Sequence, residues 1–466
     1  MIVLGIDLAT AGARVQALEV ESGATLAELR APLPVTGSAG ERTQPPRYAE
    51  VVRDLITGVT GLLGARAAEV RALSITGTSG TVVPADEHGV PVGDALLYDD
   101  PRGVPLSTDR PSAALARAGW LQAHAPAPRY LFTPDVVAAS LAGRLLPSDT
   151  SHALKSAIDP VAAAWDPAAL AEAGVPPESM PELVPPGRII GTVMRPGALG
   201  LSPGVAIVSG MTDGSTGQIA TGAVSEGDTV AVLGTTLVLK AVAARDIVDR
   251  VAGVYSHVAP DGRFWAGGAS NTGAGVLGAE FDPARHTAAI EAVGPSPVVV
   301  YPLARPGERF PVADPAFAGF SVGLDGRPRD AVGEIARYRA VFEGVAFVER
   351  LALERLGELG VESRRHHVAG GAAASELWNR IRASVLQRPV VVSPGAGSAR
   401  GAAALAAAAV TGETLAVVAE RFAGERRVVD PDEAFVEVLE ERYRVFLRAV
   451  GGFDTRPAAA TQPAVE

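Results

Sequence analysis

The sequence predicts an α/β fold divided into two domains. The chain has 466 residues, which is too many for one ordinary hydrophobic core and suits about two or three domains. Short runs of β-branched residues alternate with stretches rich in Ala, Leu and Arg, as strands and helices alternate in α/β units. A strand, a small-residue turn and a second strand occur near the start of the chain and again in its middle.

The predicted strands are short and rich in β-branched residues. In chain order they are Ile2–Ile6, Ala13–Val20, Ala72–Thr76, Val205–Ser209, Thr229–Leu233, Thr236–Val242, Pro297–Tyr301, His366–Val368 and Val390–Val392. The predicted helices include Ala49–Leu63, Asp135–Ala142, Ile335–Leu356, Ser375–Leu386, Gly401–Ala409 and Pro431–Val450. Asp135 lies in the first turn of its helix, where the helix dipole favours an acid.

Two predicted β-hairpins divide the chain. One turns at Gly5-Ile6-Asp7-Leu8-Ala9-Thr10 and the other at Leu233-Gly234-Thr235-Thr236. One such hairpin in each half is what a duplicated nucleotide-binding fold would contain. We therefore expect an N-terminal domain over residues 1–220 and a C-terminal domain over 221–450. Residues 451–466 are rich in Pro and Ala near their end, and we expect a disordered tail.

Composition excludes several classes of function. The chain carries 41 basic and 52 acidic residues, a net charge of −11, which would repel nucleic acid and anionic membranes. It has no cysteine, so disulfides, thiolate catalysis and Cys-based zinc sites are absent. Asp7 comes too early for a signal peptide, and no apolar run is long enough to cross a bilayer. These features suit a cytoplasmic protein.

The chain lacks the lysine motifs of two large groups of ATP-binding enzymes. Lys155 and Lys240 are its only lysines, and neither follows a Gly-rich loop, so there is no P-loop. The lysine-bearing motif set of protein kinases is missing as well. The histidines show no metal-ligand spacing, and His257 is interpreted as structural.

Asp7 and Asp213 are the strongest candidates for chemistry. Asp7 ends the first strand, where a carboxylate can hold Mg²⁺ directly or through water, and Thr10 with the amides near Ala11 and Gly12 can bond phosphate. Asp213 lies between a strand and a predicted helix, where ligands of α/β sheets usually bind, and it could accept the proton of an attacking hydroxyl. The alternatives are a turn cap for Asp7 and a helix N-cap for Asp213.

Three further segments could contact ligands. Gly234-Thr235-Thr236 offers a close backbone approach and hydroxyls for phosphate, and Gly370-Gly371 precedes a helix, so its amides could face a nucleotide. Asp99-Asp100-Pro101-Arg102 could orient the hydroxyls of a polar ligand. The alternative for each is an ordinary turn or a solvated loop.

The order of these segments resembles the FGGY carbohydrate kinases, from about Ile2 to Ala409. The matching motifs are Gly5 to Thr10, Tyr98 to Arg102, Gly210-Met211-Thr212-Asp213, Gly234-Thr235-Thr236, and Gly370-Gly371 through Trp378 to Pro389-Val390. The resemblance implies two actin-like (ribonuclease H-like) domains with an ATP cleft between them. It also implies ATP and Mg²⁺ as cofactors, with Asp213 as the base, Asp7 near Mg²⁺ and the sugar, and adenosine near Gly371 and Ser375.

A finer resemblance indicates the plant and cyanobacterial xylulokinase-like branch, which is thought to phosphorylate D-ribulose. Four segments carry it: Thr76-Gly77-Thr78-Ser79-Gly80-Thr81-Val82, Gly253-Val254-Tyr255-Ser256-His257, Gly267-Gly268-Ala269-Ser270-Asn271, and Gly307-Glu308-Arg309-Phe310-Pro311 with Asp314-Pro315. The resemblance assigns sugar contacts to Ser79, Asp7 and Asp213, and to the segment of Asp100 and Arg102. The alternatives are D-xylulose or another polyol as the substrate, a sugar sensor that has lost turnover, and an actin-like ATPase without a small substrate.

Three positions depart from the family pattern. Ala9 replaces the glycine of the first turn, and we expect it to narrow the backbone angles there. Ala372 replaces a third glycine of the adenosine segment. Ala396-Gly397 stands where an acid is usual. The last two departures affect the expected adenine contacts, and neither Asp7 nor Asp213 is touched.

Overall fold

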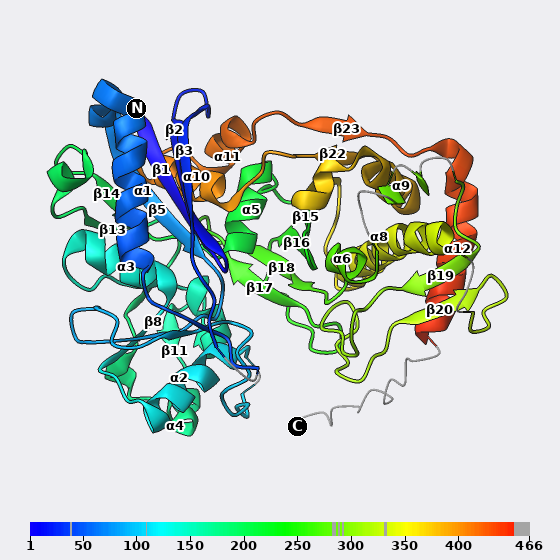
Figure 1. The fold of residues 1–466 in the computed structure, drawn as a ribbon, viewed down its shortest axis with the longest axis horizontal. Coiled ribbons are helices and arrows are strands. Elements are labelled where there is room, and N and C mark those ends of the chain that lie inside the picture. Colours follow the sequence, from blue (N-terminus) through cyan, green and yellow to red (C-terminus); the bar gives the residue numbers. More distant parts are fainter. Residues whose placement is uncertain are drawn as a thin grey trace, which may run out of the picture.

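The computed structural model describes residues 1–37, 40–108, 110–281, 286–287, 289–290, 293–329 and 333–451. Its two large sheets lie side by side, with helix α5 (Asp213–Thr221) between them (Figure 1). Of the predicted tail, Gly451 closes the last helix, and residues 452–466 lie outside the described ranges.

The first sheet has six strands and contains the first predicted hairpin. Their order is β13 (Ile189–Thr192), β14 (Ala206–Val208), β5 (Val70–Gly77), β1 (Ile2–Ala9), β2 (Gly12–Glu19) and β3 (Thr25–Pro32). β1 and β2 are antiparallel, which confirms the hairpin. β1, β5 and β14 run parallel to one another, so their carboxyl ends share one edge of the sheet.

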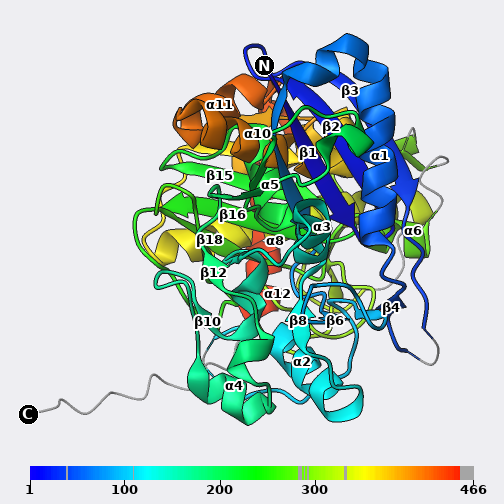
Figure 2. The same cartoon turned by 90° about the vertical axis from the view of Figure 1, so that its left-hand side faces the viewer.

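The alternation of side chains along β1 determines on which face of the sheet Asp7 lies. Ile2, Leu4, Ile6 and Leu8 pack into one core with α1 (Tyr48–Leu63) and α3 (Thr133–Ala142). Val3 belongs to a second core with α10 (Ser398–Thr411) and α11 (Leu415–Phe422). Because side chains alternate along a strand, Asp7 shares the face of Val3. In the turned view α1 and α10 lie on opposite sides of β1 (Figure 2).

Glycine lets α10 and α5 approach this face closely. A Cβ on Gly5 of β1 would lie 1.7 Å from the carbonyl oxygen of Ala399, and one on Gly401 would lie 1.8 Å from that of Thr216. Neither distance is possible for real atoms, so both positions require glycine. The first turn of α10 is thereby held against β1 and α5.

The second sheet has seven strands and contains the second predicted hairpin. Their order is β17 (Tyr255–Val258), β18 (Phe264–Ala269), β16 (Leu237–Ala243), β15 (Asp228–Leu233), β21 (Arg365–Ala369), β22 (Val390–Val392) and β23 (Arg427–Val429). β15 and β16 are antiparallel, as predicted. α8 (Glu334–Glu358), α9 (Glu376–Leu386) and α12 (Glu433–Gly451) pack on one face. Val242 and Trp265 on the other face pack toward Ile219 of α5.

Shorter elements complete the fold. The small strands are β4 (Thr43–Gln44), β6 (Val83–Ala85), β7 (Ala95–Leu96), β8 (Arg129–Leu131), β9 (Ser148–Asp149), β10 (Ile158–Asp159), β11 (Ala164–Trp165), β12 (Leu183–Val184), β19 (Val298–Tyr301) and β20 (Phe320–Gly323). Further helices are α2 (Ala113–His124), α4 (Pro167–Ala173) and α6 (Gly275–Glu280), and 3₁₀ turns occur at η1 (Gly64–Glu69), η2 (His152–Ser156), η3 (Pro177–Ser179), η4 (Pro196–Leu199) and η5 (Gly371–Ala374). Within the described ranges, no helix is long and apolar enough to span a bilayer.

Every predicted strand and helix named above is present, with ends shifted by a few residues. Asp135 lies in the first turn of α3 as predicted, and its Oδ2 accepts a 2.9 Å hydrogen bond from the amide of Phe132. Gly143 then ends α3 with a left-handed φ of 68°, a conformation in which glycine is favoured. His366 and His367 lie in β21, as predicted.

Candidate active site

Three predicted site residues lie at the shared carboxyl edge of β1, β5 and β14. Asp7 is near the end of β1, opposite Thr76 of β5. Ser79 follows the end of β5, and Asp213 follows β14 through a short loop. This edge is where ligands usually bind in α/β sheets.

Asp7 has an unsatisfied carboxylate oxygen. Its Oδ1 is buried and has no hydrogen-bond partner among the described residues. Burial and the nearby charge of Asp213 raise the pKa of Asp7 to about 7, while Arg14, which faces Asp7 across the hairpin, opposes the rise. A buried polar oxygen without a partner is costly, so this atom is suited to a metal ion, a water or a ligand hydroxyl.

Asp213 is the first residue of α5, and Thr212 takes the N-cap position. The Gly214 amide donates a 2.6 Å hydrogen bond to Asp213 Oδ1. Burial raises the pKa of Asp213, and the Gly214 amide together with the positive charges of Lys155, Lys240 and His152 opposes that rise. The carboxylate therefore lies in an environment that is both desolvated and rich in positive charge.

Hydrogen bonds fix the start of α5 from both sides. The Thr212 amide donates to Ser151 Oγ at 3.1 Å, and Ser151 Oγ lies 3.1 Å from Nδ1 of His257 in β17. Thr76 Oγ1 donates to the carbonyl oxygen of Met211 at 2.6 Å. His257 is thus linked through Ser151 to the backbone of the residue that precedes Asp213, which suits a structural role.

Ser79 offers a second unsatisfied atom, since its buried Oγ has no partner among the described residues. Arg117 ties the neighbouring segment in place by donating to the carbonyl oxygens of Gly80, at 3.0 and 3.2 Å, and of Asp100, at 3.2 Å. The predicted substrate segment therefore adjoins Ser79.

Asp100 and Arg102 form an ion pair with each other. Arg102 donates from Nε at 2.8 Å and from Nη2 at 2.7 Å to the two Asp100 oxygens, and the Arg42 amide donates to Oδ2 at 2.7 Å. The Arg102 guanidinium also lies 4.6 Å from the centre of the Trp120 ring. Asp100 is only 3% exposed. Both side chains therefore hold the loop together in this structure.

The two predicted phosphate hairpins have open, small-residue turns. In the first, Thr10 and Ala11 join β1 to β2, which begins at Gly12. In the second, the Gly234 amide donates to the carbonyl oxygen of Thr236 at 3.0 Å, and Thr235 is exposed. No atom lies within 4 Å of where a Cβ on Gly234 would be, so a ligand has room to approach the backbone.

The predicted adenosine segment lies beside the second hairpin. Gly370 has a left-handed φ of 87°, and a Cβ there would lie 2.5 Å from the carbonyl oxygen of Leu233, so glycine is required. Gly371 begins η5 and has open space where a Cβ would be. Ser375 caps α9, because its Oγ accepts a 3.3 Å hydrogen bond from the Trp378 amide.

The three departures have different consequences. Ala9 pairs with Gly12 at the end of β1 and is not left-handed, so the expected restriction of the turn by alanine does not arise. Ala372 lies inside η5. A Cβ on Gly397 would lie 3.1 Å from Nη1 of Arg14, so the Arg14 guanidinium occupies the neighbourhood of the missing acid.

Three basic residues near the two aspartates were not predicted from the sequence. Arg14 faces Asp7, and its position could have been read from the hairpin register. Lys155 and Lys240 each act on the pKa of Asp213, although they come from η2 and β16. The signal in the sequence was the rarity of lysine, although neither lysine follows a Gly-rich loop.

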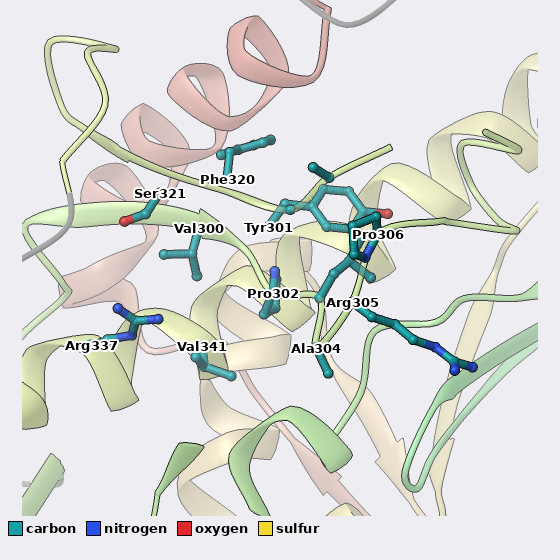
Figure 3. A pocket seen from close by; sticks show the side chains of 13 residues that line it. Val300, Tyr301, Pro302, Ala304, Arg305, Pro306, Phe320, Ser321, Arg337 and Val341 are labelled. Carbon is teal, nitrogen blue, oxygen red and sulfur yellow. The ribbon is translucent and has the colours of Figure 1, made fainter. Parts of the chain in front are cut away.

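One surface pocket in the described part of the chain lies away from the candidate active site. It measures about 340 Å³ and is lined by Val300, Phe320 and Val341, among others (Figure 3). None of the predicted site residues borders it. The described residues also contain no group of three His, Asp or Glu side chains able to hold a metal ion.

Residues 229–410 match the model of the C-terminal domain of the FGGY family of carbohydrate kinases. Over these residues the chain is similar to the FGGY carbohydrate kinases. It is therefore a sugar kinase. The match covers β15 to most of α10, which includes the second hairpin, Gly370 and Gly371.

Named relatives extend this likeness over most of the chain. A xylulose kinase of Streptomyces rubiginosus is 28% identical over 448 residues, which cover 90% of each chain. A gluconokinase of Bacillus licheniformis is 22% identical over 69% of this chain and 70% of its own. The crystal structure of xylulose kinase from Rhodospirillum rubrum superposes with a TM-score of 0.84 at 22% identity, covering 97% of this chain and 99% of that one. The α/β fold is thus that of solved sugar kinases.

Proposed function

We propose that this kinase transfers the terminal phosphoryl group of ATP to the terminal hydroxyl of a ketopentose, with D-ribulose as the preferred acceptor. The observation that carries the proposal is the grouping at one sheet edge of Asp7, Ser79 and Asp213. Asp7 Oδ1 and Ser79 Oγ have no partner among the described residues, and such atoms suit the hydroxyls of a sugar.

Two actin-like domains would then divide the binding of sugar and nucleotide between them. Residues 1–220 would bind the sugar at the edge that carries Asp7, Ser79 and Asp213. Residues 221–450 would bind the nucleotide, with the cleft between the two sheets. Asp100 and Arg102 would shape the sugar pocket as a paired wall, since both Asp100 oxygens already accept hydrogen bonds.

Asp213 would orient the acceptor hydroxyl and take its proton during transfer. Its carboxylate keeps Oδ2 outside the bond to the Gly214 amide, and the surrounding positive charges favour its ionised form. A positioned base contributes about 10²–10⁴ in rate. Asp7 would hold the sugar or the metal with its unpartnered oxygen.

The residues present fit MgATP. Phosphates would lie against the turns at Thr10, Ala11 and Gly12 and at Gly234, Thr235 and Thr236, and adenosine would lie near Gly370, Gly371 and Ser375. Mg²⁺ would neutralise phosphate charge. With no cluster of three ligand side chains in the described ranges, the ion would depend on Asp7 with water and phosphate oxygens, as Mg²⁺ often does.

The first test is ADP release from MgATP with D-ribulose, D-xylulose, L-ribulose, glycerol or no sugar. Release with D-ribulose well above all others supports the full proposal. Release chiefly with D-xylulose would replace the acceptor and leave the kinase chemistry intact. D-xylulose is the second candidate because the Streptomyces relative, 28% identical over 90% of each chain, is a xylulose kinase.

Asp213→Ala should leave a folded protein with sugar-dependent turnover lowered by about 10²-fold or more, since the base is lost. The same ADP assay, with circular dichroism to check folding, measures this. Turnover close to that of the unmodified enzyme in a folded variant would remove Asp213 from the mechanism.

A further inference from the structure

Lysine is confined to the surroundings of one carboxylate in this protein. The 41 basic residues are 39 arginines and the two lysines Lys155 and Lys240. Lys155 comes from η2 in the first half of the chain and Lys240 from β16 in the second. Both nevertheless place their positive charge near Asp213. Every other Lys or Arg position in the chain carries arginine. The positions of Lys155 and Lys240 therefore favour the smaller ammonium group.

Lys240 lies on the face of the second sheet that covers the start of α5. Gly267 of β18 pairs with Lys240 on one side and with Tyr255 on the other, so the three form one row across the sheet. Val242, on the same face as Lys240, packs in the core that contains Ile219 of α5. The lysine side chain thus points from the second sheet at the helix that begins with Asp213.

The Lys240 ammonium is buried in the first turn of α5. The residue is only 5% exposed, and its Nζ donates a 2.6 Å hydrogen bond to Ser215 Oγ. Ser215 Oγ lies 3.2 Å from Oγ1 of Thr212, the residue before Asp213. Nζ also lies 3.9 Å from where a Cβ on Gly214 would be. Among the described residues, Lys240 forms no ion pair within 4.0 Å.

This placement works against stability. A helix N-terminus carries partial positive charge and disfavours a cation, and a buried ammonium without a directly paired carboxylate is costly. A methionine of similar length would fill the same space without either cost. A lysine kept in such a place points to a task that its charge performs.

We propose that Lys240 is a positioning residue, which holds the Asp213 carboxylate ionised and fixes the first turn of α5 through Ser215. The inference rests on the proposed role of Asp213 as the base. Asp213 must be ionised to take the acceptor's proton, and burial opposes ionisation. A fixed cation behind the carboxylate offsets that cost before any substrate arrives, in the manner of preorganised electrostatics.

Other charged groups around Asp213 also affect its ionisation, and the contribution of Lys240 is judged beside theirs. Asp7 faces it from β1 with the same sign, while His152 and Lys155 face it from η2 with the opposite sign. Burial lowers the pKa of Lys240 to about 7, against the pull of Asp213. Its charge is therefore present on the acidic side of neutrality, where Asp213 most needs help to stay ionised, and fades at alkaline pH.

Removal of the Lys240 charge should change the pH dependence of kcat. Without the Lys240 charge, the pKa of Asp213 rises, so the acidic limb of the kcat profile moves to higher pH. We expect Lys240→Met to shift the acidic limb by about one unit, which lowers kcat by up to about 10-fold at pH values on that limb, and to approach the unmodified enzyme at alkaline pH. KM for ATP and for the sugar should stay within about two-fold, because the proposed role of Lys240 acts on Asp213 and not on either ligand.

Three further variants distinguish the effect of the Lys240 charge on kcat from the effect of its packing. Ser215→Ala removes the anchor but keeps the charge, so kcat should fall while the acidic limb keeps its position. Lys240→Arg keeps a charge and should also leave the limb in place. Arg245→Met, which removes a cation just beyond the end of β16, is the matched control and should change neither kcat nor the limb.

The experiment is kcat and KM against pH for these variants, with melting temperature as the stability readout. An unshifted acidic limb in Lys240→Met, or a loss of activity explained by a lower melting temperature, overturns the inference. If Lys240→Met does not fold, Lys240→Arg decides, because a limb that moves although the charge is kept contradicts it. Asp213→Ala is measured in parallel. Activity in that variant would refute the proposed base, whereas an inactive Asp213→Ala beside an unaffected Lys240→Met would refute only the role of Lys240.

Discussion

At the scale of single residues, two unsatisfied hydroxyls on β5 and its following loop can be told apart by experiment. Ser74 and Ser79 both have a buried Oγ without a partner among the described residues. Ser74 lies inside β5, opposite Gly5 of β1, whereas Ser79 lies beyond the end of the strand and close to the candidate site. Only Ser79 lies where a bound sugar could form a hydrogen bond with the unpartnered Oγ.

Ser79→Ala should therefore raise KM for D-ribulose about 3- to 10-fold, the usual value of one hydrogen bond, with little change in melting temperature. Ser74→Ala is the matched control, and it should leave KM unchanged. Initial-rate kinetics of both variants measure the difference. Equal effects on KM would show that Ser79 acts through packing and not through the substrate.

Some residues of the candidate site could be predicted because each follows a strand in the sequence. Asp7 and Asp213 stand next to runs of Val, Ile and Ala, and this local pattern is visible without a structure. Lys155 and Lys240 were missed because their nearness to Asp213 comes from the packing of β16 and η2 around α5, which no local pattern encodes. Whether each residue has its proposed role stays a prediction.

At the scale of secondary-structure elements, the two hairpins were predictable because strand, turn and returning strand are adjacent in the chain. β3, β17 and β18 were not predicted. β3 is partly exposed along most of its length, and β18 contains two adjacent glycines, Gly267 and Gly268, which weaken the strand pattern. Those glycines have a packing reason, since a Cβ on Gly267 would lie 2.0 Å from the carbonyl oxygen of Leu239.

The contact between β1 and α10 gives an element-scale prediction. Gly5→Ala would place a Cβ 1.7 Å from the Ala399 carbonyl oxygen, so α10 must move away from the strand that carries Asp7. We expect the free energy of unfolding to fall by about 3 kcal/mol, together with a loss of activity. Urea denaturation of the purified variant measures this.

Gly61→Ala is the control for that change. Gly61 lies in α1 with open space around its Cβ position, so alanine there should add about 0.5–1 kcal/mol of stability. Similar stability of the Gly5 and Gly61 variants would mean that β1 and α10 are not held as closely as the structure indicates.

At the scale of the whole molecule, the start of α5 is held by both halves of the chain. Ser151 and Thr76 come from the first half, and His257 and Lys240 come from the second sheet. A sugar bound at Asp213 and a nucleotide bound at the second hairpin would therefore act on one shared set of contacts.

The two ligands should consequently stabilise the protein synergistically. A non-hydrolysable ATP analogue with Mg²⁺ and D-ribulose, added together, should raise the melting temperature by more than the two separate shifts combined, because ligand stabilisation grows with affinity and each ligand would order part of the other's site. Differential scanning fluorimetry measures this. Additive shifts would indicate two independent sites.

The scarcity of lysine also makes this enzyme unusually open to selective chemical labelling. An amine-directed acylating reagent would meet only the Met1 amine, Lys155 and Lys240 in the chain. The Met1 amine is paired with Glu21 at 3.0 Å, and Lys240 is buried. Lys155 is partly exposed, and burial lowers its pKa to about 8, so more of it is in the nucleophilic neutral form near neutral pH than for an ordinary lysine. A fluorophore could thus be attached beside Asp213 without introducing a cysteine, and sugar that protects the amine would report binding directly.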